Sequence, residues 1–254
     1  MAGAFEFLGH VSFLTASRMK DYTLGPGYLI FCARKSAGTA RNIMTITLHV
    51  FPPSPRSFKV LLAAEQLKVP YEMKLVNLGT GEQKSDALSR LNLNQRVPVL
   101  TDGDYALWES NAILEYLASV APDGKFLAKD VKARLQITKW LYWESAHWDS
   151  ACAVFIFERL VKKRFNMGQE SAQEIERANA LFKRLAPVLN EQLSRHAYIC
   201  GDELTIADFA MVAPLCVYEG AQLPIADMPA IQSWMQRLRA LPAWQAATQL
   251  QTII

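Results

Sequence analysis

Two serines in a proline-rich loop are the side chains best placed for anion chemistry. Ser54 and Ser57 lie in the segment FPPSPRS, residues 51–57, between an alternating stretch typical of a strand and a stretch with helical spacing. A hydroxyl donor and the positive end of a helix both stabilise an anion. Ser54 is the first candidate and Ser57 the alternative, whose ordinary role would be helix N-cap. Arg56 either adds positive charge there or is a solvated loop side chain.

A second polar pair, Glu109 and Ser110, opens a predicted helix. Backbone N–H groups at a helix N-terminus bind carboxylates, and the Ser110 hydroxyl can assist them. Glu109 can accept an ammonium group. The ordinary role of Ser110 is N-cap, and one serine can serve both purposes.

Composition argues against several other chemistries. The four cysteines show no Cys-x-x-Cys spacing, which disfavours a metal site and is typical of free thiols in a reducing, cytoplasmic compartment. The net charge of +3 comes from residues 1–43, and the remainder holds 22 basic and 22 acidic groups. Nucleic-acid binding therefore has little electrostatic support. Since no run of 18 apolar residues occurs, we expect no membrane partner.

The spacing of apolar residues and turn signals predicts an α/β unit followed by helices only. Asp102-Gly103, between two short strand-like runs, is a hairpin signal. An isolated helix between the first two strands implies a right-handed parallel crossover. The predicted elements are strands at 45–50, 71–76, 97–100 and 105–108 and helices at 57–67, 84–91 and 110–120, then helices at 131–165, 171–196, 205–218 and 229–239.

This order, βαβαββα and then helices, predicts two domains, 44–121 and 129–247, joined by a linker near 121–129. Pro214 is expected to kink the helix at 205–218. Residues 1–43 differ in composition from the rest. We interpret them as a poorly ordered N-terminal extension or as a segment upstream of a natural start at Met44.

Three motifs together resemble the soluble, cytosolic glutathione transferase superfamily, of bacterial type with a serine-type active-site loop. The first is the loop FPPSPRSFKV at 51–60. The second is RVPVL at 96–100, followed by DG at 102–103 and ESNAI at 109–113. The third is LTIADF at 204–209. The resemblance covers nearly all of residues 44–247. It implies a thioredoxin-like domain that binds glutathione, followed by an all-α domain that helps bind an electrophile.

The resemblance also implies roles for the two polar pairs. Ser54, or alternatively Ser57, would stabilise the thiolate of glutathione, the co-substrate. Glu109 and Ser110 would hold its γ-glutamyl end. Thr205 and Asp208 would form a capping box that starts a core helix and takes no part in the chemistry.

The remaining glutathione contacts implied by the resemblance come from residues 83–98. The Val97-Pro98 turn would pair with the cysteinyl backbone if its bond is cis, and the sequence leaves the isomer open. Gln83, Lys84 and Arg96 would face the glycyl carboxylate. Members usually have Asn-Pro-x-Gly before that arginine, whereas this chain has NLNQ at 92–95. We therefore expect a more flexible turn here.

An aromatic stretch at 140–148 corresponds to the helix that lines the electrophile pocket in this family. Trp143 and His147 are four residues apart and are assigned to that pocket, with core packing as the alternative for both. The resemblance further implies a homodimer and a metal-free transferase, with dehalogenation, isomerisation or peroxide reduction as related activities. The alternative function is a non-catalytic binding or regulatory protein of the same fold.

Overall fold

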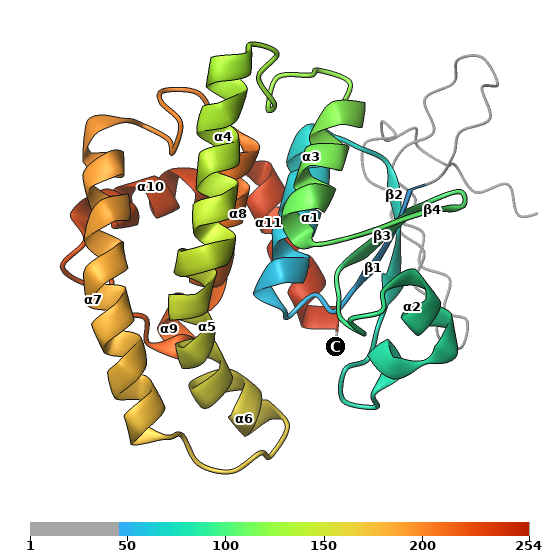
Figure 1. Ribbon diagram of the computed structural model, residues 1–254, viewed down its shortest axis with the longest axis horizontal. Helices are drawn as coiled ribbons and strands as arrows, with labels where there is room; N and C mark the ends of the chain where they lie inside the picture. The colour runs from blue at the N-terminus through green and yellow to red at the C-terminus, as the bar shows by residue number, and fades with distance from the viewer. Residues whose placement is uncertain (1–45, 254) are drawn as a thin grey trace, which may run out of the picture.

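The computed structural model describes residues 46–253, so the interpretation of residues 1–43 lies outside the described part (Figure 1). The first unit follows the predicted βαβαββα order. A short 3₁₀ helix, η1, precedes its second helix. The elements are β1 (Ile46–Val50), α1 (Pro55–Leu67), β2 (Tyr71–Leu75), η1 (Glu82–Lys84), α2 (Asp86–Leu91), β3 (Val99–Asp102), β4 (Tyr105–Trp108) and α3 (Ser110–Val120).

The four strands form one sheet in the order β2-β1-β3-β4. β1 and β2 are parallel and joined through α1, which confirms the parallel pairing of the predicted crossover, while β3 is antiparallel to β1 and β4. The β3–β4 hairpin turns at Gly103-Asp104, where Gly103 has φ 58°. β3 begins at Val99, two residues later than predicted, because Pro98 has no N–H for the ladder.

The second unit is entirely helical. α4, α5 and α6 follow one another as a single column interrupted by two π-helical segments, η2 and η3, and α7 packs along α5 (Figure 1). The elements are α4 (Val131–Trp143), η2 (Glu144–Trp148), α5 (Asp149–Ile156), η3 (Phe157–Val161), α6 (Lys162–Arg164), α7 (Ala172–Arg195), α8 (Ile206–Val212), η4 (Ala213–Val217), α9 (Tyr218–Ala221), α10 (Pro229–Arg239), α11 (Pro242–Leu250) and η5 (Gln251–Ile253).

Two features of the helical unit differ from the prediction. The helix predicted at 205–218 does not kink and continue. Instead α8 ends at Val212 and a 3₁₀ segment follows, because Pro214 cannot donate to an α-helical bond. Helical structure also extends past the predicted limit at residue 247. α11 packs on α1 there, with the rings of Trp244 and Phe58 4.9 Å apart.

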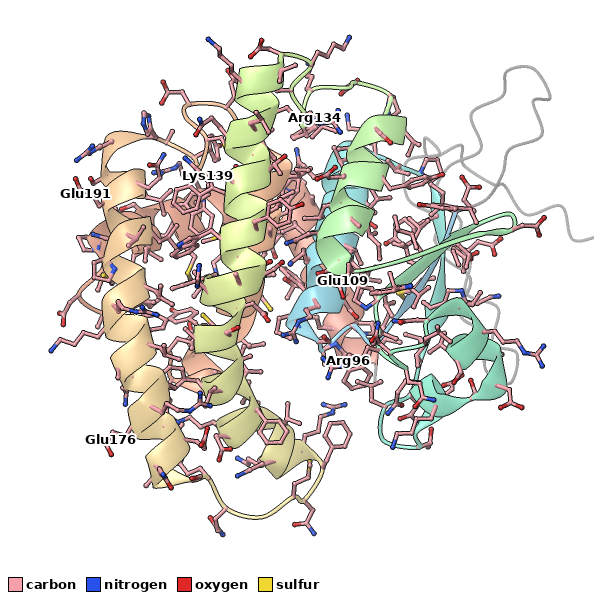
Figure 2. The ribbon with its side chains drawn as sticks, viewed as in Figure 1. Arg96, Glu109, Arg134, Lys139, Glu176 and Glu191 are labelled. Atoms are coloured by element: carbon pink, nitrogen blue, oxygen red, sulfur yellow. The ribbon has the colours of Figure 1, made fainter. Side chains whose placement is uncertain are left out.

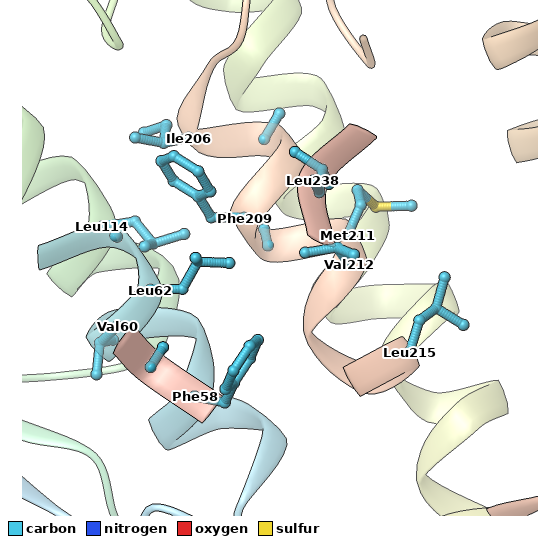
Figure 3. Close-up of a cluster of buried hydrophobic side chains, with 14 of the residues drawn as sticks. Phe58, Val60, Leu62, Leu114, Ile206, Phe209, Met211, Val212, Leu215 and Leu238 are labelled. Carbon is cyan, nitrogen blue, oxygen red and sulfur yellow. The ribbon is translucent and has the colours of Figure 1, made fainter. Parts of the chain in front are cut away.

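The two units share one hydrophobic core (Figure 3). Nine residues of α1 are buried, because the helix contacts α3 on one side and α8, η4 and α11 on the other. Side chains from both units meet in this core: Phe58, Val60, Leu62 and Leu114 from the first and Ile206, Phe209, Met211, Val212, Leu215 and Leu238 from the second. This packing places the N-terminal ends of α1 and α3 beside the helical unit.

Within residues 46–253, every helix is too short or too polar to span a bilayer.

Candidate active site

A cavity of about 360 Å³ lies where the two units meet. Its walls come from α1, from the loop before β3, from the N-terminus of α3, and from η2 and α5 of the helical unit. Arg96 and Glu109 both line it (Figure 2). The cavity therefore brings together Glu109, Ser110, Arg96, Val97 and Pro98, five of the residues assigned to glutathione binding.

Ser54 is the N-cap residue of α1, with extended backbone (φ −74°, ψ 130°). Its carbonyl accepts the Phe58 N–H at 2.8 Å, and Pro55 occupies the first helical position, which needs no donor. The hydroxyl does not cap the helix, and among residues 46–253 it has no hydrogen-bond partner. A half-buried, unengaged hydroxyl at a helix N-terminus is free to donate to a ligand.

Ser57 has a different position from the one expected. The predicted N-cap role belongs to Ser54, and Ser57 is the third residue of α1, fully buried. Its Oγ accepts a hydrogen bond from the Phe51 N–H at 3.2 Å, which closes the loop between β1 and α1. Ser57 thus holds the loop that presents Ser54. The choice between the two as thiolate partner stays a prediction, and this geometry favours Ser54.

Arg56 is neither unpaired nor freely solvated. Its guanidinium forms an ion pair with the carboxylate of Asp149 at the start of α5, and both residues line the cavity. The pair bridges the two units beside the cavity. Because the charge of Arg56 is matched by Asp149, any positive field at the cavity is weaker than the sequence implies.

The Val97-Pro98 bond, whose isomer the sequence left open, is cis. The turn before it is closed by Asn92, which is buried: its side-chain amide donates to the Arg96 carbonyl at 2.9 Å, and its Oδ1 accepts the Asn94 N–H at 2.9 Å. Gln95 takes the left-handed conformation, φ 54°. Side-chain hydrogen bonds therefore close this turn in place of the missing proline, and its greater flexibility stays a prediction.

Glu109 is the N-cap residue of α3 and is exposed, with φ 71°. Such a conformation costs a non-glycine residue about 1–3 kcal/mol and occurs often at functional sites. Ser110 is therefore the first helical residue and not the N-cap. The residue is 8% exposed, and its hydroxyl accepts a hydrogen bond from the Lys59 Nζ at 3.1 Å.

The other assigned residues, Ser54 and Ser57 among them, are not among the residues that line this cavity. Gln83 and Lys84 belong to η1 and are not among its lining residues. Trp143 and His147 do not line it either. The rings of Trp143 and Trp148 stack 6.2 Å apart, which is the core-packing alternative, and His147 is exposed. The assignment of these four residues to ligands stays a prediction.

A buried ionic cluster behind Ser110 was missed in the sequence analysis. Lys59 and Glu144 form an ion pair of 2.9 Å, with side chains only 2% and 3% exposed. Asn111 contacts both, its Oδ1 2.8 Å from Lys59 and its Nδ2 2.8 Å from Glu144. The available signal was a lysine on the apolar face of a predicted helix, a position where charge is rarely buried without a partner.

The cysteines described by the structure are free thiols and do not line the cavity. Burial raises the pKa of Cys216 to about 12 and that of Cys200 to about 11, and it raises the pKa of Cys152 as well. Such thiols are poor nucleophiles at neutral pH. Residues 46–253 contain no cluster of three or more metal-ligating His, Cys, Asp or Glu side chains.

A four-stranded sheet with α1 and α3 packed on a helical unit, and a polar cavity at their junction, defines a two-domain protein of the thioredoxin-like class. Family models agree: residues 44–119 match the glutathione S-transferase N-terminal domain and residues 147–242 the C-terminal domain. The chain belongs to the glutathione S-transferase family.

Individual relatives span most of the chain. Glutathione S-transferase 3 of Zea mays is 30% identical over 205 residues, which is 79% of this chain and 91% of that protein. Disulfide-bond oxidoreductase YfcG of Escherichia coli is 29% identical, over 76% of this chain and 90% of that protein. A glutathione transferase family member from Pseudomonas fluorescens, crystallised with two glutathione molecules, is 27% identical. Its TM-score is 0.72, and the match covers 82% of this chain and 94% of that one.

Proposed function

We propose that the protein is a glutathione transferase that binds glutathione in the 360 Å³ cavity and adds its thiolate to an electrophilic small molecule. The observation that carries the proposal is the meeting of Glu109, Ser110, Arg96 and the cis Val97-Pro98 turn in one cavity, in a chain of this family. These residues present acceptors, donors and a cation, which match the termini of a tripeptide with an ammonium and two carboxylates.

In the proposed complex, the γ-glutamyl end of glutathione lies at the N-terminus of α3. The exposed carboxylate of Glu109 accepts its ammonium, and the Ser110 hydroxyl and the helix N–H groups donate to its carboxylate. The backbone at Val97 pairs with the cysteinyl residue. Arg96, with Gln83 and Lys84 as weaker candidates, faces the glycyl carboxylate.

The chemical step needs a thiolate at neutral pH. A thiol with an ordinary pKa of about 8.5 is only a few per cent ionised at pH 7. A hydrogen bond to a charged group contributes about 1.5–3 kcal/mol, equivalent to about one to two pKa units. The Ser54 hydroxyl and the N-terminus of α1 supply this preference for the anion. The sulfur lone pair then attacks the electrophilic carbon, and the leaving group departs with its electron pair.

A second candidate reaction is the reduction of a disulfide by glutathione, favoured by the similarity to the disulfide-bond oxidoreductase of Escherichia coli. The same stabilised thiolate would attack a disulfide sulfur, forming a mixed disulfide and releasing a thiolate. A second glutathione would then complete the exchange. Comparing turnover of an aryl halide with turnover of a small disulfide separates the two reactions.

Calorimetric titration with glutathione, followed by a chromogenic aryl-halide assay, tests the proposal. We expect saturable binding and turnover that Glu109→Ala and Ser110→Ala both weaken, mainly through the glutathione KM. Binding without turnover of either the aryl halide or the disulfide would support the non-catalytic alternative. If millimolar glutathione produces no saturable heat, the proposed function is wrong.

We also propose a homodimer in the cytoplasm. Large apolar side chains lie exposed on β4 and α4, including Tyr142 at 74%, Leu135 at 58% and Tyr105 at 51%. Tyr105 and Tyr142 line a larger, mainly apolar cavity of about 560 Å³ between α3 and α4, and Leu135 lies on the same helix as Tyr142. An exposed apolar surface of this kind is typical of an interface between subunits. The free thiols of the described cysteines suit a reducing compartment.

A further inference from the structure

The Lys59 ammonium in α1 is fully surrounded by acceptors. It is 1% exposed, and its Nζ lies 3.1 Å from Ser110 Oγ, 2.8 Å from Asn111 Oδ1 and 2.9 Å from Glu144 Oε1. An ammonium has three N–H donors and no acceptor, so these three contacts use all of them. Lys59 can therefore only donate to Ser110.

This contact restricts what the Ser110 hydroxyl can do. A serine hydroxyl has one O–H donor and two lone pairs, and one lone pair already accepts from Lys59. Among residues 46–253, no acceptor lies within hydrogen-bond distance of the Ser110 O–H. Ser110 lines the 360 Å³ cavity, so its O–H is left to donate to a ligand there. Donation by the ammonium also polarises the hydroxyl and strengthens it as a donor.

Glu144 and Asn111 hold the ammonium in place. Glu144 is in the π-helical segment η2 of the helical unit, and its second oxygen accepts the Asn111 amide at 2.8 Å. The same amide lies 3.0 Å from the Leu141 carbonyl. The ion pair therefore joins α1, the N-terminus of α3 and the second unit, and Glu144 balances the buried charge of Lys59.

We propose that Lys59 is a positioning residue for glutathione binding: it directs the Ser110 hydroxyl outward as a donor to the carboxylate of the γ-glutamyl group. The inference rests on the proposed function, and it goes further by naming a buried residue that acts only through Ser110. Glu144, from the other unit, couples the packing of the two units to that subsite.

A double-mutant cycle on glutathione affinity tests this role. We expect Lys59→Met to weaken the calorimetric Kd for glutathione about tenfold, the scale of one charge-assisted hydrogen bond. In the Ser110→Ala background, the same Lys59→Met change should shift the Kd less than about twofold. Because Lys59→Met leaves the Glu144 charge buried without its ion-pair partner, the cycle is repeated with Lys59→Met/Glu144→Gln, which removes both charges.

A ligand lacking the relevant carboxylate gives an independent readout. The analogue 4-aminobutyryl-cysteinyl-glycine is glutathione without its γ-glutamyl carboxylate, and its affinity should be the same in the wild type and in both Lys59 variants. Lys162→Met, which breaks the ion pair of Lys162 with Glu158 at 2.6 Å outside the cavity, is the matched control and should leave both affinities unchanged.

The outcomes are distinguishable. Lys59→Met could weaken the affinity for glutathione and for the analogue equally, or weaken glutathione binding equally with and without the Ser110 hydroxyl. Either result would mean that Lys59 only supports the fold, which overturns the proposal. An unchanged glutathione Kd in the double-charge variant would overturn it as well. If the wild-type protein does not bind glutathione, the proposed function itself fails, and the inference about Lys59 fails with it.

Discussion

Ser54 and Ser57 are three residues apart at the N-terminus of α1, yet they have different environments. Ser57 is buried and bonded to the Phe51 N–H, whereas the Ser54 hydroxyl is unengaged at the N-cap. Both serines are near a helix N-terminus, so the electrostatics alone do not separate them. The difference is whether the hydroxyl already has a partner, and this gives an experimental distinction between the two.

Ser54→Ala is expected to raise the pKa of the bound glutathione thiol by about one to two units, the equivalent of one hydrogen bond to a charged group. Glutathione should still bind, since its two ends are held elsewhere. The measurement is thiolate absorbance of the complex against pH. Ser54→Thr keeps a hydroxyl and is the matched control, which should restore most of the ionisation. An unchanged titration in Ser54→Ala would move the role to Ser57 or to backbone donors.

His49 in β1 makes the fold sensitive to acid. Burial, and to a lesser extent the positive charge of Lys74, lower its pKa from 6.5 to about 4. Between pH 6.5 and 4 the unfolded chain therefore binds a proton that the folded chain does not, so this residue makes stability fall as the pH is lowered through that range. His49→Gln should show a smaller loss of unfolding free energy between pH 7 and pH 5 in urea denaturation. An identical loss in both proteins would contradict this.

At the scale of elements, α8 depends on one buried carboxylate. Asp208 accepts the Thr205 N–H in the predicted capping box, which is confirmed, and it also accepts the Ile199 N–H and the indole N–H of Trp234, each at 2.9 Å. The residue is fully buried, so water cannot replace its carboxylate as the acceptor for these N–H donors. The side chain thus joins α8 to α10 and to the turn before α8.

Asp208→Ala is expected to lower the free energy of unfolding by about 3 kcal/mol or more, because several buried donors lose their acceptor. Urea denaturation followed by circular dichroism measures it. Glu174→Ala is the matched control: Glu174 occupies the same third position of α7, but its side chain is 41% exposed, and its loss should cost less than about 1 kcal/mol. Similar costs for the two substitutions would contradict the assigned role of Asp208.

At the scale of the whole molecule, the two units form one packed body. The core drawn in Figure 3 crosses from α1 and α3 to α8, η4 and α10, and the Lys59–Glu144 pair crosses the same boundary. The candidate site is built at this boundary. Its geometry therefore depends on both units being folded and docked together.

The proposed dimer is tested at the same scale. Leu135→Arg combined with Tyr142→Glu places charges on the exposed apolar surface of α4, and we expect sedimentation velocity to show a monomer where the wild type is a dimer. Val188→Arg is the control, because Val188 is a similarly exposed apolar residue on α7, at 47%, and should leave the dimer intact. A wild-type protein that sediments as a monomer would end the dimer proposal.

The sequence by itself determined the order of elements and the family. The 3.6-residue and 2-residue spacings, the hairpin signal and the capping box are local patterns, and each directly reflects backbone geometry. Local patterns also located the pair Glu109 and Ser110. Local patterns were less successful where a helix depends on packing between distant segments. α11 is the example, because it packs on α1, which lies far from it in the sequence.

Only the tertiary structure decided how the site residues are held. Lys59 and Glu144 are 85 residues apart in the sequence, and only folding makes them a buried pair behind Ser110. The partner of Arg56 is 93 residues away, and the isomer at Pro98 and the burial of Ser57 depend on neighbouring segments. The physical reason is that hydrogen-bond partners and burial are properties of three-dimensional proximity, which local spacing does not encode.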